Sequence, residues 1–203
     1  MMVNYVYDGS FEGLLTAIYE AYYRREQPEE IVSCHHVQEN IFCKNVYIET
    51  CEEKADKVYD SIRSKISVMA LQHVFNVYLS ELEGIGTLIY HYLRMGWKIG
   101  GKVDLYLTDE NVLQVHNISR KVGGERHRML GLVRFRKIEE EVFYAPIEPD
   151  YNIVGQLAPH FAKRLSNQRW IIHDVKRKLA AIYDTKDWVI TEVDLDQELG
   201  MEE

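Results

Sequence analysis

Apolar residues follow two different rhythms along the chain, and the change of rhythm divides it into two parts. Up to about residue 122 they recur every three or four positions, which predicts helices. Beyond that point they alternate in short runs bounded by turn residues, which predicts strands. We therefore predict an α+β protein with a helical middle region and a C-terminal antiparallel sheet. It should form a single domain over residues 1–203, helix-rich over about 1–122 and sheet-rich over about 123–193.

The helix-rich part begins with a strand over residues 3–7 that ends at the Asp8-Gly9 turn. Ser10 can then cap a helix, because a serine hydroxyl accepts from free amides at a helix start. Gly84-Ile85-Gly86 lacks the third glycine of a dinucleotide-binding fingerprint, so it predicts a break between helices. The other expected elements are a strand over 46–50, three helices within 53–95 and a helix over 109–122.

The sheet-rich part should begin with a hairpin. Residues 132–138 alternate in polarity, which would place Arg134 and Arg136 on one face of a strand. After an acidic turn, residues 142–147 would form the second strand. Residues 151–165 follow as a helix that Pro159 should kink or restart, because its ring opposes the carbonyl of Gly155. A meander of three strands, over 170–173, 179–183 and 188–193, should complete the sheet.

The composition is that of an ordinary globular protein, with 46% hydrophobic and 28% charged residues. No apolar run is long enough to span a bilayer. The first ten residues lack the basic start and apolar stretch of a signal peptide. We therefore expect a cytoplasmic protein that makes no membrane contact.

The three cysteines, Cys34, Cys43 and Cys51, suit a reducing compartment better than a disulfide framework. None lies close enough to another for the patterns that hold iron–sulfur clusters. Cys34 adjoins His35 and His36, but the spacing does not fit a structural zinc site. The sequence thus predicts no metal and no bound cofactor.

Charge is distributed unevenly along a chain whose net charge is −8. Residues 119–137 and 160–178 contain 13 of the 24 basic residues and only 2 of the 32 acids, which are Glu125 and Asp174. A localised basic surface attracts a polyanion even when the net charge is negative. The alternative is that each run is only a solvated face.

Several short segments carry a family resemblance. They are YDGSFEGLL from Tyr7, HRM from His127, VRFR from Val133, IEPD from Ile147, APHFAKR from Ala158 and RWIIHD from Arg169. Together these segments resemble a bacterial family known as probable DNA metabolism proteins. The resemblance implies a DNA repair companion of a radical SAM protein, and related domains occur fused to uracil-DNA glycosylase-like domains. It implies no catalytic residues.

The same segments supply groups suited to nucleic acid. Arginine grips phosphate oxygens with two parallel hydrogen bonds, and an indole ring can stack on a base. The predicted nucleic-acid-binding residues are His127, Arg128, Arg134, Arg136, His160, Arg164, Arg169, Trp170 and Arg177. Each has a structural alternative: ion pairs with residues 139–141 for the arginines, and a place in the core for Trp170.

Three hypotheses of function remain open. The favoured one is a DNA repair or modification accessory protein that binds DNA and acts with a radical SAM enzyme, which would hold the cluster. The second is a stand-alone nucleic-acid hydrolase or glycosylase-like enzyme with His173, Asp174 and Glu148 as candidate catalytic residues. In the third, the protein is an interaction subunit that docks an acidic partner and binds no nucleic acid.

Overall fold

The structure is a computed structural model that describes residues 2–37, 42–139 and 141–193. The chain forms two compact units, Met1–Lys121 and Val122–Glu203, which we call the N-terminal and C-terminal units. The boundary between the two units coincides with the predicted change from helix-rich to sheet-rich sequence. That the whole chain acts as one domain stays a prediction.

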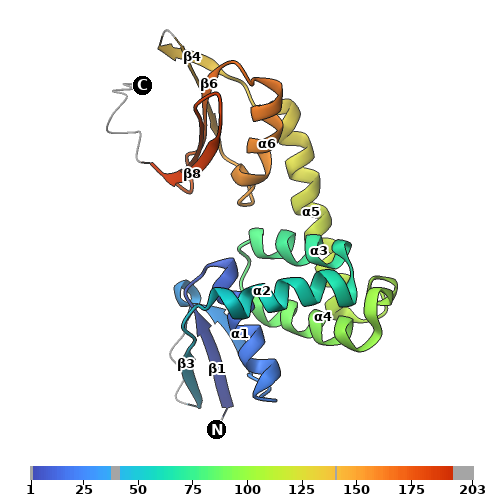
Figure 1. Ribbon diagram of the computed structural model, residues 1–203. Coiled ribbons are helices and arrows are strands. Elements are labelled where there is room, and N and C mark those ends of the chain that lie inside the picture. The colour runs from blue at the N-terminus through green and yellow to red at the C-terminus, as the bar shows by residue number, and fades with distance from the viewer. Residues whose placement is uncertain (1, 38–41, 140, 194–203) are drawn as a thin grey trace. The chain divides into compact units, whose positions relative to one another are not determined.

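A three-stranded parallel sheet lies at the start of the N-terminal unit (Figure 1). Its strands are β1 (Met2–Tyr7), β2 (Glu30–Ser33) and β3 (Cys43–Tyr47), in the order β2-β1-β3. The first strand confirms the prediction, whereas the second expected strand lies a few residues earlier than residues 46–50. The sequence pattern missed β2, because four residues give too short an alternation to recognise.

Helix α1 (Phe11–Tyr23) begins as expected at Ser10, whose hydroxyl accepts from the Gly13 amide at 2.9 Å. The Asp8 carboxylate fixes the turn before it, accepting from the Ser10 amide at 2.9 Å and from the Thr50 hydroxyl at 2.8 Å. A Cβ at Gly13 would overlap with this carboxylate. Part of the YDGSFEGLL segment is thus explained by a closely packed turn.

The helical part of this unit contains the three helices expected within residues 53–95. They are α2 (Glu52–Ser61), α3 (Val68–Leu79) and α4 (Ile85–Ile99), with a π-helical turn η2 (Ile62–Ile66) after α2. Two short 3-10 segments, η1 (Cys34–His36) and η3 (Gly100–Leu105), follow β2 and α4 respectively. Gly84 precedes α4 with a positive φ of 76°, which confirms the predicted break.

Helix α5 (Glu110–Leu132) is longer than the predicted helix over 109–122. Val115, Ile118 and Val122 lie buried along it, and the helix continues through Gly123-Gly124. Glycine in a helix costs only about 1 kcal/mol, which does not end a helix that packs well. The strand predicted over 132–138 is therefore wrong at its start: β4 is Arg136–Glu139, and Arg134 precedes it.

A five-stranded sheet forms the C-terminal unit, in the order β4-β5-β6-β7-β8. Its other strands are β5 (Val142–Ile147), β6 (Arg169–Asp174), β7 (Leu179–Tyr183) and β8 (Trp188–Glu192). Three of the four neighbouring pairs are antiparallel, which confirms the α+β class. Strands β5 and β6 are parallel, because helix α6 (Val154–Arg164) carries the chain back between them.

The core of the C-terminal unit is aromatic. Trp170 is fully buried and stacks on Tyr183, with ring centroids 5.1 Å apart. Phe161 of α6 meets the indole edge-on, with the ring centroids 6.5 Å apart.

Helix α6 contains Pro159 without the predicted restart, since it runs unbroken to Arg164. Among the described residues, no helix is long and apolar enough to cross a membrane.

Close contact between α4 and β2 gives a first testable prediction. A Cβ at Gly86 would overlap with the backbone carbonyl of Ile31, which cannot move aside as a side chain would. Gly86→Ala should therefore lower the free energy of unfolding by about 1–3 kcal/mol. Gly131 in α5 has open space around its Cα, so Gly131→Ala should raise it by about 0.5–1 kcal/mol. Urea denaturation of both variants checks this, and equal midpoints would contradict it.

Candidate nucleic-acid interface

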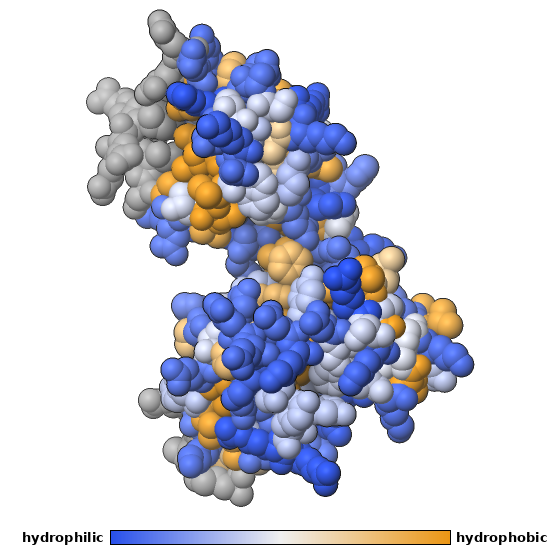
Figure 2. All heavy atoms as spheres, in the orientation of Figure 1, coloured by the Kyte–Doolittle hydropathy of each residue, from blue (hydrophilic) through white to orange (hydrophobic). Residues whose placement is uncertain are grey.

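In the described part of the C-terminal unit, basic residues outnumber acidic ones. Residues 122–139 and 141–193 contain twelve lysines and arginines against nine aspartates and glutamates. Hydrophilic side chains cover most of the face of this unit that Figure 2 shows, with hydrophobic atoms gathered over β8. Of the predicted nucleic-acid-binding residues, seven are exposed: His127, Arg128, Arg134, Arg136, His160, Arg164 and Arg169.

The only two acids of the basic runs within this unit are removed from the surface. Glu125 is 6% exposed and Asp174 is 0% exposed. Glu125 accepts from backbone amides and Asp174 pairs with Arg177, so neither carboxylate is used in an ion pair with an exposed cation of the basic runs. The exposed charged side chains of residues 122–137 and 160–178 are therefore all cations.

Glu125 faces inward from α5 onto the loop that joins β5 to α6. Its two carboxylate oxygens accept from the backbone amides of Asp150, at 2.8 Å, and Tyr151, at 2.9 Å. Sequence reasoning noted Glu125 only as the acid of a basic run. The signal for its role was its position, three residues after the buried Val122 and therefore on the same helix face.

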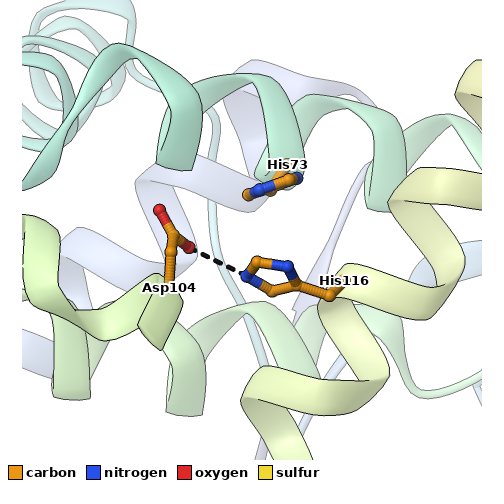
Figure 3. A group of neighbouring side chains, drawn as sticks. All are labelled: His73, Asp104 and His116. Atoms are coloured by element: carbon orange, nitrogen blue, oxygen red, sulfur yellow. Dashed lines mark hydrogen bonds and ion pairs between the residues drawn. The ribbon is translucent and has the colours of Figure 1, made fainter. Parts of the chain in front are cut away.

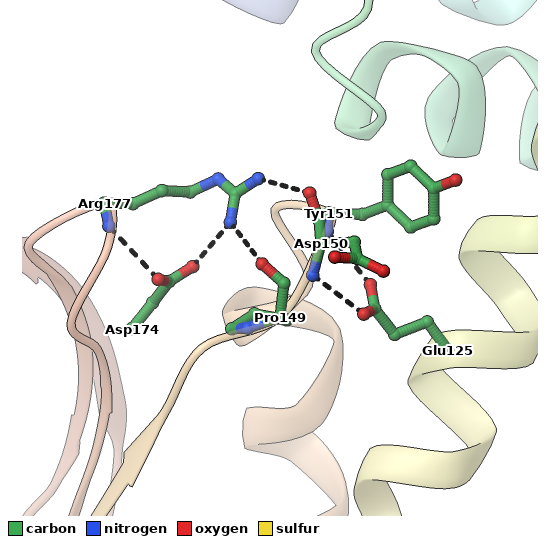
Figure 4. Close-up of polar contacts among 6 residues, drawn as sticks. All are labelled: Glu125, Pro149, Asp150, Tyr151, Asp174 and Arg177. Atoms are coloured by element: carbon green, nitrogen blue, oxygen red, sulfur yellow. Dashed lines mark hydrogen bonds and ion pairs between the residues drawn. The ribbon is translucent and has the colours of Figure 1, made fainter.

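Arg177 holds the same loop from the other side (Figure 4). Its guanidinium donates to the Asp174 carboxylate at 2.9 Å, to the Pro149 carbonyl at 3.0 Å and to the Asp150 carbonyl at 2.8 Å. The Arg177 side chain is only 13% exposed. Its predicted role in binding nucleic acid is corrected accordingly, because its donors already bind the protein's own loop.

These contacts bring the two basic runs together. Glu125 in the first run and Arg177 in the second both bind the loop of residues 149–151. The exposed Arg126 follows Glu125, and the exposed Lys176 precedes Arg177. Cations that are about fifty residues apart in the sequence are therefore anchored around one loop. The IEPD and RWIIHD segments, which carry much of the family resemblance, meet at this loop.

The candidate catalytic residues do not form one site. His173 and Asp174 are consecutive in β6, so their side chains point to opposite faces of the sheet. The His173 imidazole is 3% exposed, and its Nδ1 lies 2.8 Å from the Tyr144 hydroxyl. Asp174 pairs with Arg177, while Glu148 is exposed. This arrangement corrects the expectation that the three side chains could share a reaction.

Two further expectations about the interface are corrected. Trp170 is enclosed in the core, so its ring offers no platform on which a base could stack. Arg134 and Arg136 do not project from one strand, since Arg134 lies before β4. Its guanidinium donates to the Gly131 carbonyl at 2.6 Å, while the Arg136 guanidinium lies 5.3 Å from the Tyr144 ring centroid.

The loop contacts predict that Arg177 acts mainly on stability. Arg177→Ala would leave the buried Asp174 carboxylate without its cation, at a cost of about 3–5 kcal/mol in the free energy of unfolding. Lys176→Ala removes the same charge from the exposed neighbouring position and should change this energy by less than about 0.5 kcal/mol. Chemical denaturation measures both. A similar small effect for the two variants would show that the buried pair contributes little.

A comparison with known families identifies the family of this chain but not its activity. A family described as a domain of unknown function, DUF4130, matches residues 83–202. No curated protein matches the chain. The matched stretch includes α4, α5 and the entire C-terminal sheet, with Glu125 and Arg177, which bind the loop of residues 149–151. Because it spans more than half of the sequence, the protein belongs to the DUF4130 family.

Proposed function

We propose that this protein is a nucleic-acid-binding accessory protein of DNA repair or modification, and that it acts with a radical SAM enzyme. The observation that carries the proposal is that the two basic runs meet at one loop through Glu125 and Arg177, whose neighbours Arg126 and Lys176 are exposed. Such a surface attracts phosphates through charge alone. The family resemblance supplies the DNA context, and the charge layout is consistent with it.

An accessory role fits the chain better than an independent hydrolase. In the C-terminal unit, His173 and Asp174 are buried and engaged in contacts that hold the sheet and its loop together. A hydrolase needs an acid or base within reach of its substrate. The three cysteines do not form the pattern that binds an iron–sulfur cluster, so radical chemistry would belong to the partner.

Salt-dependent DNA binding tests the first half of the proposal. With about five phosphate contacts, log affinity against log salt should have a slope of about −4.5, so binding should weaken roughly 10²- to 10³-fold between 50 and 200 mM salt. Arg126→Ala and Lys176→Ala should each reduce that slope by about one unit, because each removes a cation beside the loop. Fluorescence anisotropy with a labelled duplex measures the slope.

The control for this experiment is Arg63→Ala, which removes an exposed cation from the N-terminal unit and should leave the slope unchanged. Equal effects of all three variants would mean that only net charge matters. The absence of binding at 50 mM salt by the folded wild-type protein, with its partner present, would end the nucleic-acid proposal. Binding of an acidic protein by the same cations would favour the interaction subunit.

Association with the radical SAM enzyme tests the second half. The last strand in the sheet order, β8, exposes Trp188, Val189 and Ile190, with Val189 58% exposed. An apolar strand at a sheet edge is suited to contact with another protein. The two proteins should co-elute at micromolar concentration, and Val189→Asp should weaken that association at least tenfold.

Val68→Asp is the matched control, because Val68 is 66% exposed and lies in the N-terminal unit. The same change there should leave co-elution intact. Separate elution of the two wild-type proteins, with and without DNA, would refute the partnership. An equal loss for both variants would place the contact away from β8.

A further inference from the structure

Three side chains of types that can ligate a metal converge in the N-terminal unit from three separate elements. His73 comes from α3, Asp104 from η3 and His116 from α5. Each offers one ligand atom, and these atoms all lie within 4.8 Å of one another. Figure 3 shows the two imidazole rings and the carboxylate turned toward a common space. All three residues are partly buried, so the group is shielded without being closed to solvent.

Distances within the group are close to those that a metal ion needs. Ligand atoms 2.0–2.2 Å from a tetrahedral zinc ion lie roughly 3.3–3.6 Å from one another. His116 Nε2 and Asp104 Oδ1 are 3.0 Å apart, and the two imidazole centroids are 4.4 Å apart. Because all three ligand atoms already lie within 4.8 Å of one another, small side-chain adjustments would place them around one ion.

The carboxylate is held in place by a second layer of contacts. The Tyr92 hydroxyl donates to Asp104 Oδ1 at 2.6 Å, and Tyr92 is itself fully buried. Hydrogen bonds of this kind orient the ligands of protein metal sites and strengthen metal binding.

His73 is oriented in the same way. Its Nδ1 lies 2.9 Å from the Ser119 hydroxyl oxygen, to which the side-chain amide of Asn76 donates at 3.0 Å. Because this contact engages Nδ1, Nε2 is the nitrogen that would bind an ion.

The geometry points to a divalent transition-metal site formed by His73, Asp104 and His116, and we propose zinc as the ion that fits it best. Two imidazoles and one carboxylate match the borderline character of Zn²⁺, while Mg²⁺ and Ca²⁺ prefer oxygen ligands alone. Three protein ligands leave a fourth position for water, which is the arrangement of zinc sites that react rather than only stabilise. The site is independent of the DNA surface, since its ligands belong to the other unit.

Metal titration of the full chain tests the proposal. After chelator treatment and dialysis, calorimetry with Zn²⁺ should detect one equivalent bound at micromolar concentration or tighter. Co²⁺ should give the visible absorption of a four- or five-coordinate ion. Tyr92→Phe should weaken zinc binding about 10- to 100-fold, because it removes only the hydrogen bond that orients Asp104. His73→Ala, His116→Ala and Asp104→Asn should each weaken it further.

His36→Ala is the matched control, because it removes an exposed imidazole from the Cys34-His35-His36 run, where metal-ligating residue types are adjacent but do not form the proposed site. It should bind zinc as the wild type does, and thermal melting should show that every variant is folded. Asp104→Asn keeps the size of the side chain, so it separates loss of a ligand from loss of the fold. No binding by the wild type would overturn the proposal, as would binding that survives His116→Ala or is lost in His36→Ala.

Discussion

The fold of the C-terminal unit depends on how the backbone amides and carbonyls of one loop find their hydrogen-bond partners. Residues 149–151 follow the parallel strand β5 and must turn back into α6, so their amides and carbonyls leave the sheet. Buried polar backbone groups require partners. Glu125 supplies acceptors for two amides, and Arg177 supplies donors for two carbonyls. The loop thereby fastens α5 and the β6–β7 turn to the sheet.

The contacts that hold this loop also determine which charged side chains of the basic runs are buried and which are exposed. A carboxylate that satisfies backbone amides is withdrawn from solvent, and Asp174 is withdrawn with it because Arg177 needs a counter-ion within the protein. The neighbours Arg126 and Lys176 stay exposed. The contacts that hold the loop thus explain why the two acids of the basic runs are buried while these cations are exposed. A count of charges along the sequence finds the basic runs but not the reason why their acids are hidden.

The sequence predicted elements that depend on local patterns and missed those that depend on distant contacts. The start of α1 at Ser10 and the break at Gly84 follow from residues within one turn. The parallel pairing of β5 with β6 depends on where α6 packs, which no local pattern records. The end of α5 was misjudged for a similar reason, since burial of Val122 and Glu125 outweighs the low helix propensity of Gly123-Gly124.

The same distinction between local patterns and distant contacts applies to the candidate functional residues. The exposed arginines could be found from composition, because charge runs are visible in the sequence. The sequence could not reveal the group of His73, Asp104 and His116, because these residues are brought together by the packing of α3, η3 and α5 and not by a recognisable spacing. The DUF4130 match begins at residue 83, so it contains Asp104 and His116 but not His73. A metal site built from these ligands would therefore require the chain that precedes the matched domain.

The two proposals can fail separately, because they rest on different chemistry. Zinc has no redox chemistry and cannot replace an iron–sulfur cluster, so a zinc site here would leave the need for a radical SAM partner unchanged. Its reactive property would be a water molecule made acidic by the ion, which serves hydrolysis. Zinc binding together with salt-dependent DNA binding would thus reopen the possibility of an enzyme, with its reactive group in the N-terminal unit instead of at His173, Asp174 and Glu148.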